Sequence, residues 1–300
     1  MASFKTWVSA LRLRTLPLSV SGIIVAGSLA EYNGLFHWGV FTMAILTTLS
    51  FQILSNLAND YGDGVKGTDN LDRIGPQRAI QSGEITPTSM FFAIRINILI
   101  SIFLAVFTIY VAFGSKYFLL GLLFLVLGML SIYAALKYTI GGNAYGYRGL
   151  GDIFVFIFFG LLSVIGAYVL FAKQIDHVTI LPAFTIGFLS TAVLNLNNLR
   201  DIESDKKANK ITMAVKMGFK KAKRYHMFLV GGAICLSFLF GILYYNSPYN
   251  FIFFIAYIPL IIHMKTVHNC IEPVKLDKEL KKLALSTFLL SVLLAVGHLL

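Results

Sequence analysis

The most regular feature of the chain is a series of long apolar runs separated by polar stretches. A helix needs about 20 mostly apolar residues to cross the hydrocarbon of a bilayer, and runs of that length recur throughout the sequence. The pattern predicts nine transmembrane helices, at about residues 15–31, 38–57, 89–113, 117–136, 150–172, 179–199, 225–245, 250–268 and 282–300. We therefore expect an all-α integral membrane protein.

Composition supports this fold class and gives no sign of a second domain. Of the 300 residues, 57% are hydrophobic and only 13% are charged, whereas about 25% of the residues in a soluble domain are charged. No low-complexity linker divides the chain, so we expect one membrane domain over residues 1–300, with polar loops at about 58–88, 137–149 and 200–224. The two cysteines show neither metal-binding nor disulfide spacing.

The distribution of basic residues predicts the orientation. If the N-terminus is cytoplasmic and the spans alternate, every lysine and arginine except Lys116 and Lys173 lies in a cytoplasmic segment or helix end. Positive residues collect on the cytoplasmic side of membrane proteins, so we expect a multi-pass protein with a cytoplasmic N-terminus. A bacterial inner membrane is its expected location. The net charge of +11 then follows from topology and from contact with anionic headgroups of the lipid bilayer, and it requires no nucleic acid.

Acidic residues gather where two of the predicted helices leave the membrane. Residues 56–69 read NLANDYGDGVKGTD, and residues 195–205 read NLNNLRDIESD. At helical spacing, each stretch places an asparagine and one or two acids on a single face. These residues are Asn59 and Asp63 in the first stretch, and Asn197, Asp201 and Asp205 in the second.

This arrangement of acids predicts a metal site. Several carboxylates at a membrane edge repel one another unless a cation neutralises them. Mg²⁺ prefers oxygen ligands and is usually held by one or two carboxylates together with substrate phosphates. We therefore predict that Mg²⁺ bridges a diphosphate to both acidic clusters. The candidate metal ligands are Asp60, Asp63, Asp69, Asp201 and Asp205.

The residues alone leave two other interpretations of these clusters open. Each cluster can be a solvated loop whose acids pair with nearby lysines and arginines. The clusters can also form the cation site of a carrier or channel, although transporters usually bind their ions near the bilayer midplane. Seven of the chain's 14 acidic residues fall within residues 60–72 and 201–205, which favours a shared site.

Basic and aromatic residues near the clusters suit an anionic substrate. Arginine and lysine hold phosphoryl oxygens, and glycine-rich backbone at membrane depth, as in residues 136–152 (LKYTIGGNAYGYRGLGD), is tolerated where it lines a cavity. The candidate substrate-binding residues are Asn59, Lys66, Arg73, Lys137, Tyr138, Tyr147, Arg148, Asn197 and Arg200, and Arg78 in GPQRAIQSG is a catalytic candidate. The alternative is that the basic residues only set topology and that the tyrosines are interfacial.

Four stretches together carry a resemblance to a known family: NDYGD with Asp69, GPQRAIQSG, YRGLGD and NNLRDIESD. They resemble the UbiA superfamily of intramembrane aromatic prenyltransferases, over roughly residues 7–220. The opening LRLRTLPLSVSGIIVAGSLA is most similar to the subfamily that prenylates 1,4-dihydroxy-2-naphthoate in menaquinone synthesis. The resemblance implies a nine-helix bundle with a lateral opening to lipid, and Mg²⁺-dependent binding of a polyprenyl diphosphate on the cytoplasmic side.

The resemblance also implies which residues form the two aspartate motifs. The matching residues are Asn59, Asp60 and Asp63 for the first motif, and Asp201 and Asp205 for the second. The family pattern has one more acid in its first motif, at the position where this chain has Gly67. Asp69 stands two residues later and is the candidate replacement.

The implied reaction transfers the polyprenyl group to a ring carbon of 1,4-dihydroxy-2-naphthoate with loss of CO₂ and diphosphate. We expect Arg78 and Mg²⁺ to stabilise the leaving diphosphate, and Asp201 is a candidate for taking a proton from the acceptor. The catalytic candidates are Asp63, Arg78, Asp201 and Asp205. 4-Hydroxybenzoate, homogentisate or haem is the alternative acceptor, and no obligate protein partner is expected.

Overall fold

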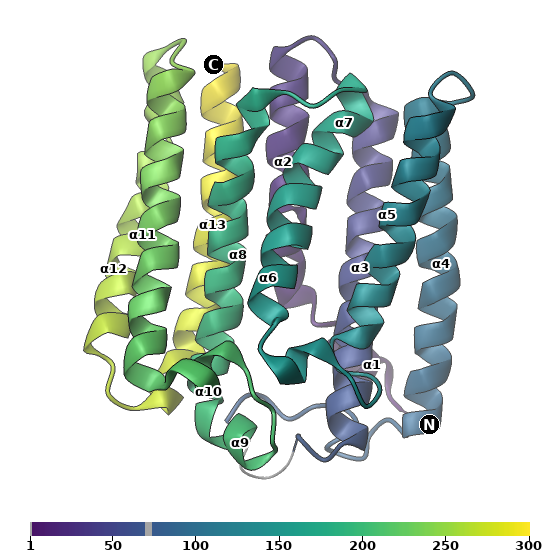
Figure 1. Cartoon of the computed structure of the whole chain (residues 1–300), viewed down its shortest axis with the longest axis vertical. Coiled ribbons are helices and arrows are strands. Elements are labelled where there is room, and N and C mark those ends of the chain that lie inside the picture. Colours follow the sequence, from purple (N-terminus) through teal and green to yellow (C-terminus); the bar gives the residue numbers. More distant parts are fainter. Residues whose placement is uncertain (1, 70–73) are drawn as a thin grey trace.

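Helices occupy the predicted apolar runs in the computed structural model, which describes residues 2–69 and 74–300 (Figure 1). Within these residues all regular elements are helical. Eight helices are long and apolar enough to cross a membrane. A ninth crossing results if α1 (Phe4–Leu11) and α2 (Leu16–Tyr32), which meet at a bend, are counted as one span.

The eight candidate crossings agree closely in position with the predicted runs. They are α3 (Trp38–Val65), α4 (Pro87–Phe113), α5 (Phe118–Lys137), a composite helix over Gly151–Ala172, α8 (Ile180–Arg200), α11 (Phe219–Leu243), α12 (Phe254–Asn269) and α13 (Asp277–Leu299). A short helical turn precedes α8, α12 and α13 and lengthens each of these crossings at its start. The composite helix consists of α6 (Gly151–Val155), a π-helical segment (Phe156–Gly166) and α7 (Ala167–Ala172).

The helices differ in how much of their surface is buried. In its most apolar window α8 has 61% of its residues buried, whereas α5 has 17%, so α8 is packed inside the bundle and most of α5 lies on its outer surface. Glycines allow α8 and the π-helical segment to approach closely, since a Cβ on Gly160 would lie 2.6 Å from Gly187 Cα. Exposed rings such as Phe103 on α4, 68% exposed, suit contact with acyl chains.

Two helices extend further than the apolar pattern predicts. The apolar run of α3 ends near residue 57, but the helix continues to Val65. Tertiary contacts support this extension, because the hydroxyl of Thr139 donates to the carbonyl of Ala58 at 2.9 Å. In the same way α11 begins at Phe219 instead of residue 225. Parts of the predicted loops 58–88 and 200–224 are therefore helical.

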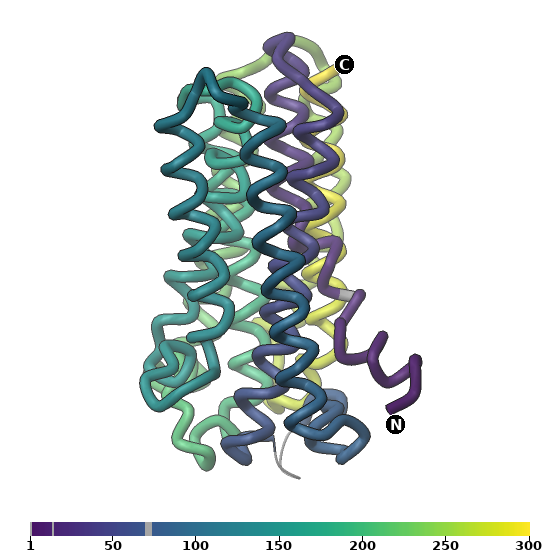
Figure 2. Tube along the Cα trace, turned by 90° about the vertical axis from the view of Figure 1, so that its right-hand side faces the viewer, coloured from purple at the N-terminus to yellow at the C-terminus, as the bar shows by residue number. Residues whose placement is uncertain are grey.

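One end of the bundle carries the polar connections. Residues 66–69, 74–86 and 138–150 lie at this end, together with α1, α9 (Ile202–Lys207) and α10 (Met213–Met217), and we call it the loop end (lower end in Figure 1). The N-terminus lies at the loop end and the C-terminus at the opposite end (Figure 2). Since α3 and α8 both finish at the loop end, the two acidic clusters meet on the same side of the bundle.

Candidate active site

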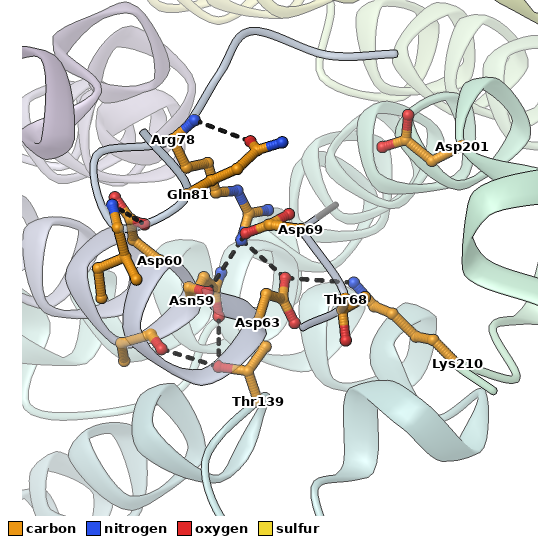
Figure 3. A network of polar contacts seen from close by, with 12 residues as sticks. Asn59, Asp60, Asp63, Thr68, Asp69, Arg78, Gln81, Thr139, Asp201 and Lys210 are labelled. Carbon is orange, nitrogen blue, oxygen red and sulfur yellow. Dashed lines mark hydrogen bonds and ion pairs between the residues drawn. The ribbon is translucent and has the colours of Figure 1, made fainter. Parts of the chain in front are cut away.

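Asp63 is the centre of a polar network at the loop end of α3 (Figure 3). Its carboxylate accepts hydrogen bonds from Arg78 Nη1 and from the Tyr147 hydroxyl, both at 2.7 Å. Asn59 lies one turn earlier on the same face, and its main-chain carbonyl oxygen accepts a bond from Arg78 Nη1 at 2.9 Å. The predicted face of Asn59 and Asp63 exists because α3 stays helical through Val65.

A tight turn after α3 returns Asp69 to this network. Gly67 has a φ of +70°, in the left-handed region that glycine adopts without strain. The N–H groups of Thr68 and Asp69 then lie 3.0 and 3.4 Å from the Asp63 carbonyl oxygen. Asp69 Oδ2 reaches to 2.8 Å from Arg78 Nη1. The residue that stands in place of the missing motif acid therefore makes the turn that brings Asp69 beside Asp63.

Asp60 contacts the backbone of the segment that carries Arg78. Its carboxylate oxygens accept bonds from the N–H groups of Ala79 at 3.3 Å and Ile80 at 3.4 Å. The N–H of Arg78 itself donates to Gln81 Oε1 at 3.2 Å. In this arrangement Asp60 orients Arg78 through the main chain, and its role as a metal ligand stays a prediction.

Tyr147 brings the glycine-rich stretch 136–152 to the same point. Its hydroxyl lies 2.6 Å from Thr68 Oγ1 as well as contacting Asp63. Lys66 Nζ lies 4.0 Å from the centre of its ring, a favourable cation–π distance. Burial, and then the negative charge of Asp63, raise the pKa of Tyr147, so the hydroxyl keeps its proton and acts as a donor.

The second acidic cluster lies where α8 passes into α9. The N–H of Asp205 donates to the carbonyl of Asp201 at 2.8 Å, which preserves helical spacing across the junction. Arg200 is 2% exposed and binds both carboxylate oxygens of Asp201, at 2.7 and 2.6 Å. It also contacts Asn197 Oδ1 at 3.0 Å and Asp277 Oδ1 at 2.7 Å. Arg200 thus fixes the orientation of Asp201.

Lys210 joins the two clusters, although the sequence does not distinguish it from the other basic residues of its loop. Its Nζ lies 3.4 Å from Asp63 Oδ2 (Figure 3). The same nitrogen lies 3.8 Å from Asp205 Oδ1. Burial alone would lower the pKa of Lys210, but these two carboxylates outweigh burial and raise it. The side chain is therefore a charged ammonium between the ends of α3 and α8.

The carboxylates of the two clusters suit a hard divalent cation that takes its remaining ligands from other oxygen donors. Among the residues that the structure describes, no three acidic, histidine or cysteine side chains are grouped closely enough to hold an ion alone. Pairs of carboxylates suffice for Mg²⁺ when substrate phosphates and water complete the coordination. Burial raises the pKa of Asp205 to about 7, although the ammonium of Lys210 opposes the shift. Additional positive charge near Asp205 would therefore stabilise its ionised form.

A cavity of about 310 Å³ lies beside the network. Its lining is mostly apolar, and along α3 it runs from Ala44 to Asn59, about 22 Å at 1.5 Å per residue. Aromatic rings line the part near the acids: Tyr145 stacks on Phe154 at 4.0 Å between ring centres, and Tyr138 meets Tyr145 edge-on at 5.3 Å. The acids therefore stand at one end of an elongated apolar space.

Two of the predicted binding residues, Lys137 and Arg148, are not part of the network. Lys137 is in the last turn of α5, and a Cβ on Gly141 would lie 3.3 Å from its Nζ. Arg148 is exposed, and its carbonyl oxygen accepts a bond from Lys216 at 2.7 Å. Both side chains stay outside the hydrogen bonds and ion pairs described above for Asp63 and Asp205. Arg73 lies outside the described residues.

Comparison with known proteins agrees with the resemblance. The model of the UbiA prenyltransferase family matches residues 20–294. The chain is 42% identical to 1,4-dihydroxy-2-naphthoate octaprenyltransferase of Escherichia coli K12, over 98% of this chain and 94% of that protein. It is 39% identical to the protein of the same name from Haemophilus influenzae, over 98% of this chain and 95% of the relative.

Solved structures share the fold. A UbiA homologue from Archaeoglobus fulgidus bound to GPP and Mg²⁺ superposes with a TM-score of 0.63 at 15% identity, over 96% of this chain and 99% of the other. A digeranylgeranylglyceryl phosphate synthase gives a TM-score of 0.63 at 20% identity, over 98% of both chains. The match to the family over most of the sequence, the identity to the bacterial relatives and the common fold lead to one conclusion: this chain belongs to the UbiA prenyltransferase family.

Proposed function

We propose that the protein transfers a polyprenyl group from polyprenyl diphosphate to 1,4-dihydroxy-2-naphthoate, releasing CO₂ and diphosphate and forming the reduced form of demethylmenaquinone. The observation that carries the proposal is the meeting of two acidic clusters, linked by Lys210, at one end of an apolar cavity. A donor with an anionic head and a long apolar chain needs both environments side by side. The bacterial relatives that carry the name of this activity, at 42% and 39% identity, support the choice of acceptor.

Four acids of the two clusters are the proposed metal ligands. They are Asp63, Asp69, Asp201 and Asp205. When bound, Mg²⁺ would neutralise charge on the diphosphate. Arg78 and Tyr147 hold Asp63 in place through bonds of 2.7 Å, and the contacts of Asp60 with the N–H groups of residues 79 and 80 hold Arg78.

Arg78 is the proposed partner of the leaving diphosphate. Its Nη1 binds oxygens of the protein, while its Nε–H is buried without a hydrogen-bond partner among the described residues. A buried donor that lacks a partner is costly, and a diphosphate oxygen would satisfy it. Cations held in position before the carbon–oxygen bond breaks stabilise the charge that develops on the leaving group.

The rings of Tyr138 and Tyr145 are the proposed surroundings of the allylic cation. They line the cavity next to Asn59, close to the acids. Aromatic faces attract cations through their quadrupole. The apolar remainder of the cavity excludes water, which would otherwise capture the cation and yield an alcohol.

The acceptor carries its own leaving group, which simplifies the second step. The ring carbon that bears the carboxylate forms a bond to the terminal carbon of the allylic cation. The bond from that ring carbon to the carboxylate then breaks, its electron pair restores the aromatic ring, and CO₂ departs. No proton has to be removed from this carbon, so the step does not require Asp201 as a base.

In the proposed membrane placement, the loop end faces the cytoplasm of a bacterial inner membrane and α1 with α2 forms a ninth crossing. The basic residues concentrate in segments of this end, as the positive-inside tendency requires. The termini lie at opposite ends of the bundle, as expected for an odd number of crossings (Figure 2). The donor would then present its diphosphate at the level of the inner headgroups.

The test is product formation in membranes that contain the protein, supplied with 1,4-dihydroxy-2-naphthoate, a polyprenyl diphosphate and Mg²⁺, and followed by mass spectrometry. We expect the prenylated, decarboxylated product, and a loss of roughly 100-fold or more for Asp63→Asn. Glu203→Gln is the matched control, because Glu203 is an exposed acid of the second cluster region.

Other outcomes would redirect or reject the proposal. Product formed only with 4-hydroxybenzoate, homogentisate or haem would reassign the acceptor. Full turnover by Asp63→Asn would show that the acidic clusters do not take part in the reaction. Cation-driven uptake into liposomes without any prenyl donor would indicate a transporter.

A further inference from the structure

Lys210 lies where a single positive charge contacts both acidic clusters. Its Nζ is 3.4 Å from Asp63 Oδ2 and 3.8 Å from Asp205 Oδ1, and the residue is only 8% exposed. Charges at such separations interact several times more strongly in a poorly solvated site than in bulk water. Lys210 is therefore an internal counter-ion that connects the end of α3 to α9.

The local backbone directs Lys210 to this position. Asn209 has a φ of +54°, in the left-handed region that asparagine tolerates better than most residues. The N–H of Lys210 donates to the carbonyl of Asp205 at 2.8 Å, and the N–H of Ile211 donates to the carbonyl of Tyr147 at 3.2 Å. The segment is thus tied on both sides of Lys210, and its ammonium is held toward the acids.

A divalent cation and the Lys210 ammonium need the same carboxylate oxygens. Two positive ions at one oxygen repel each other, and the repulsion is strong where water is scarce. A cation that binds to Asp63 and Asp205 must therefore displace Lys210. The lysine stem is flexible and carries a compact charge, so the ammonium can move away while the backbone stays in place.

We propose that Lys210 exchanges partners during substrate binding: it pairs with Asp63 and Asp205 until a divalent cation takes these carboxylates, and it then pairs with the diphosphate. This inference rests on the proposed function, because it takes a diphosphate as the anionic group of the substrate. A cation that binds alone breaks both ion pairs of Lys210 and leaves the ammonium without an anionic partner. A cation that arrives with a diphosphate offers the ammonium a new anion, so the two ligands bind cooperatively and Lys210 disfavours the metal by itself.

The experiment measures the two ligands separately in the purified full-length protein. Mn²⁺ serves as the cation because its electron paramagnetic resonance signal reports binding, and inorganic pyrophosphate serves as the anion. For Lys210→Gln we expect Mn²⁺ alone to bind roughly fivefold more tightly, and pyrophosphate with Mn²⁺ to bind roughly tenfold more weakly. The opposite signs are the signature, because a damaged site would bind both ligands more weakly.

Two further variants separate this exchange from general effects of charge. Lys206→Gln removes an exposed lysine from the same segment, and we expect it to change either affinity by less than about twofold. Lys210→Arg keeps the positive charge, and we expect it to restore most of the pyrophosphate affinity. Thermal unfolding of each variant shows whether the fold is intact.

Unchanged or weaker binding of Mn²⁺ alone by a folded Lys210→Gln protein would overturn the exchange. Failure of the exchange is distinguishable from failure of the proposed function. If the wild-type protein binds neither Mn²⁺ nor pyrophosphate and forms no prenylated product, the proposed function fails. If the wild-type protein binds both and forms product while Lys210→Gln binds as the wild type does, only the exchange is wrong.

Discussion

At the scale of the residue, Arg78 organises the first acidic cluster through one nitrogen atom. Its Nη1 lies 2.7 Å from Asp63, 2.8 Å from Asp69 and 2.9 Å from the Asn59 carbonyl oxygen. The guanidinium is planar and always charged, and its donors have fixed directions. These properties allow a single side chain to keep two carboxylates together and still present another N–H to a substrate.

The substitution Arg78→Lys tests whether this geometry matters beyond the charge. A lysine retains the positive charge, but all its N–H groups are on a single nitrogen atom, so it cannot hold both acids and the Asn59 main chain with one nitrogen and present a second nitrogen to a diphosphate. We expect kcat/KM for the polyprenyl diphosphate to fall about 10–100-fold in steady-state kinetics. Arg95→Lys, on the exposed face of α4, is the control and should retain activity. Wild-type kinetics for Arg78→Lys would show that charge alone is sufficient.

At the scale of the element, a glycine sets the distance between α3 and the segment that follows α5. A Cβ on Gly62 would lie 2.4 Å from Thr139 Oγ1 and 2.8 Å from the Thr139 carbonyl carbon. This close approach allows the Thr139 hydroxyl to bind the Ala58 carbonyl. It also places Tyr147, further along the same segment, within 2.7 Å of Asp63.

Gly62→Ala should therefore damage the site although alanine favours helices. The gain in helix propensity is about 1 kcal/mol, whereas forcing a methyl group into a packed contact costs about 1–3 kcal/mol. Because the clash involves backbone, we expect the cost to exceed the gain, with a lower apparent Tm and lower activity. Gly142→Ala is the control, since a Cβ there meets no atom within 4 Å. A Tm for Gly62→Ala at or above that of the wild type would contradict the argument.

At the scale of the whole molecule, the cavity borders both buried cores of the bundle. One core includes residues of α2, α8, α11 and α13 together with the first part of α3, such as Ala44, and the other includes the later part of α3, such as Leu54, with residues of α4. The cavity is lined by residues of α2, α3, α4, α5 and the composite helix, and it runs away from the acids along α3. Its length matters for a donor with a long chain and hardly at all for a short one.

Ala44→Phe tests this use of the cavity. Ala44 lines the part of the cavity that is far from the acids along α3, and a phenyl ring would occupy that space. We expect turnover with a long polyprenyl diphosphate to fall about tenfold relative to turnover with geranyl diphosphate, measured by product mass spectrometry. Leu46→Phe, at a side chain of α3 that is 40% exposed, should affect neither donor. Equal losses for both donors would show that the ring disturbs the fold instead.

Local patterns explain which features could be predicted from the sequence. The spans were predictable because burial in hydrocarbon depends on the length of each apolar run. The face shared by Asn59 and Asp63 was predictable because helical periodicity depends only on spacing. The directions of Asp60 and Asp69 were not, because they depend on the N–H groups of residues 79 and 80 and on the turn at Gly67.

The sequence by itself determined that this chain is a helical membrane protein with acids at two helix ends and with the motifs of its family, because hydropathy and periodicity act within one segment. Only the tertiary structure decided which basic side chain connects the two groups of acids. The contact of Lys210 with Asp63 spans 147 positions of the chain, and its formation depends on α3, α9 and Tyr147 folding to one point. Such a contact depends on distance in space, which the order of residues along the chain does not state.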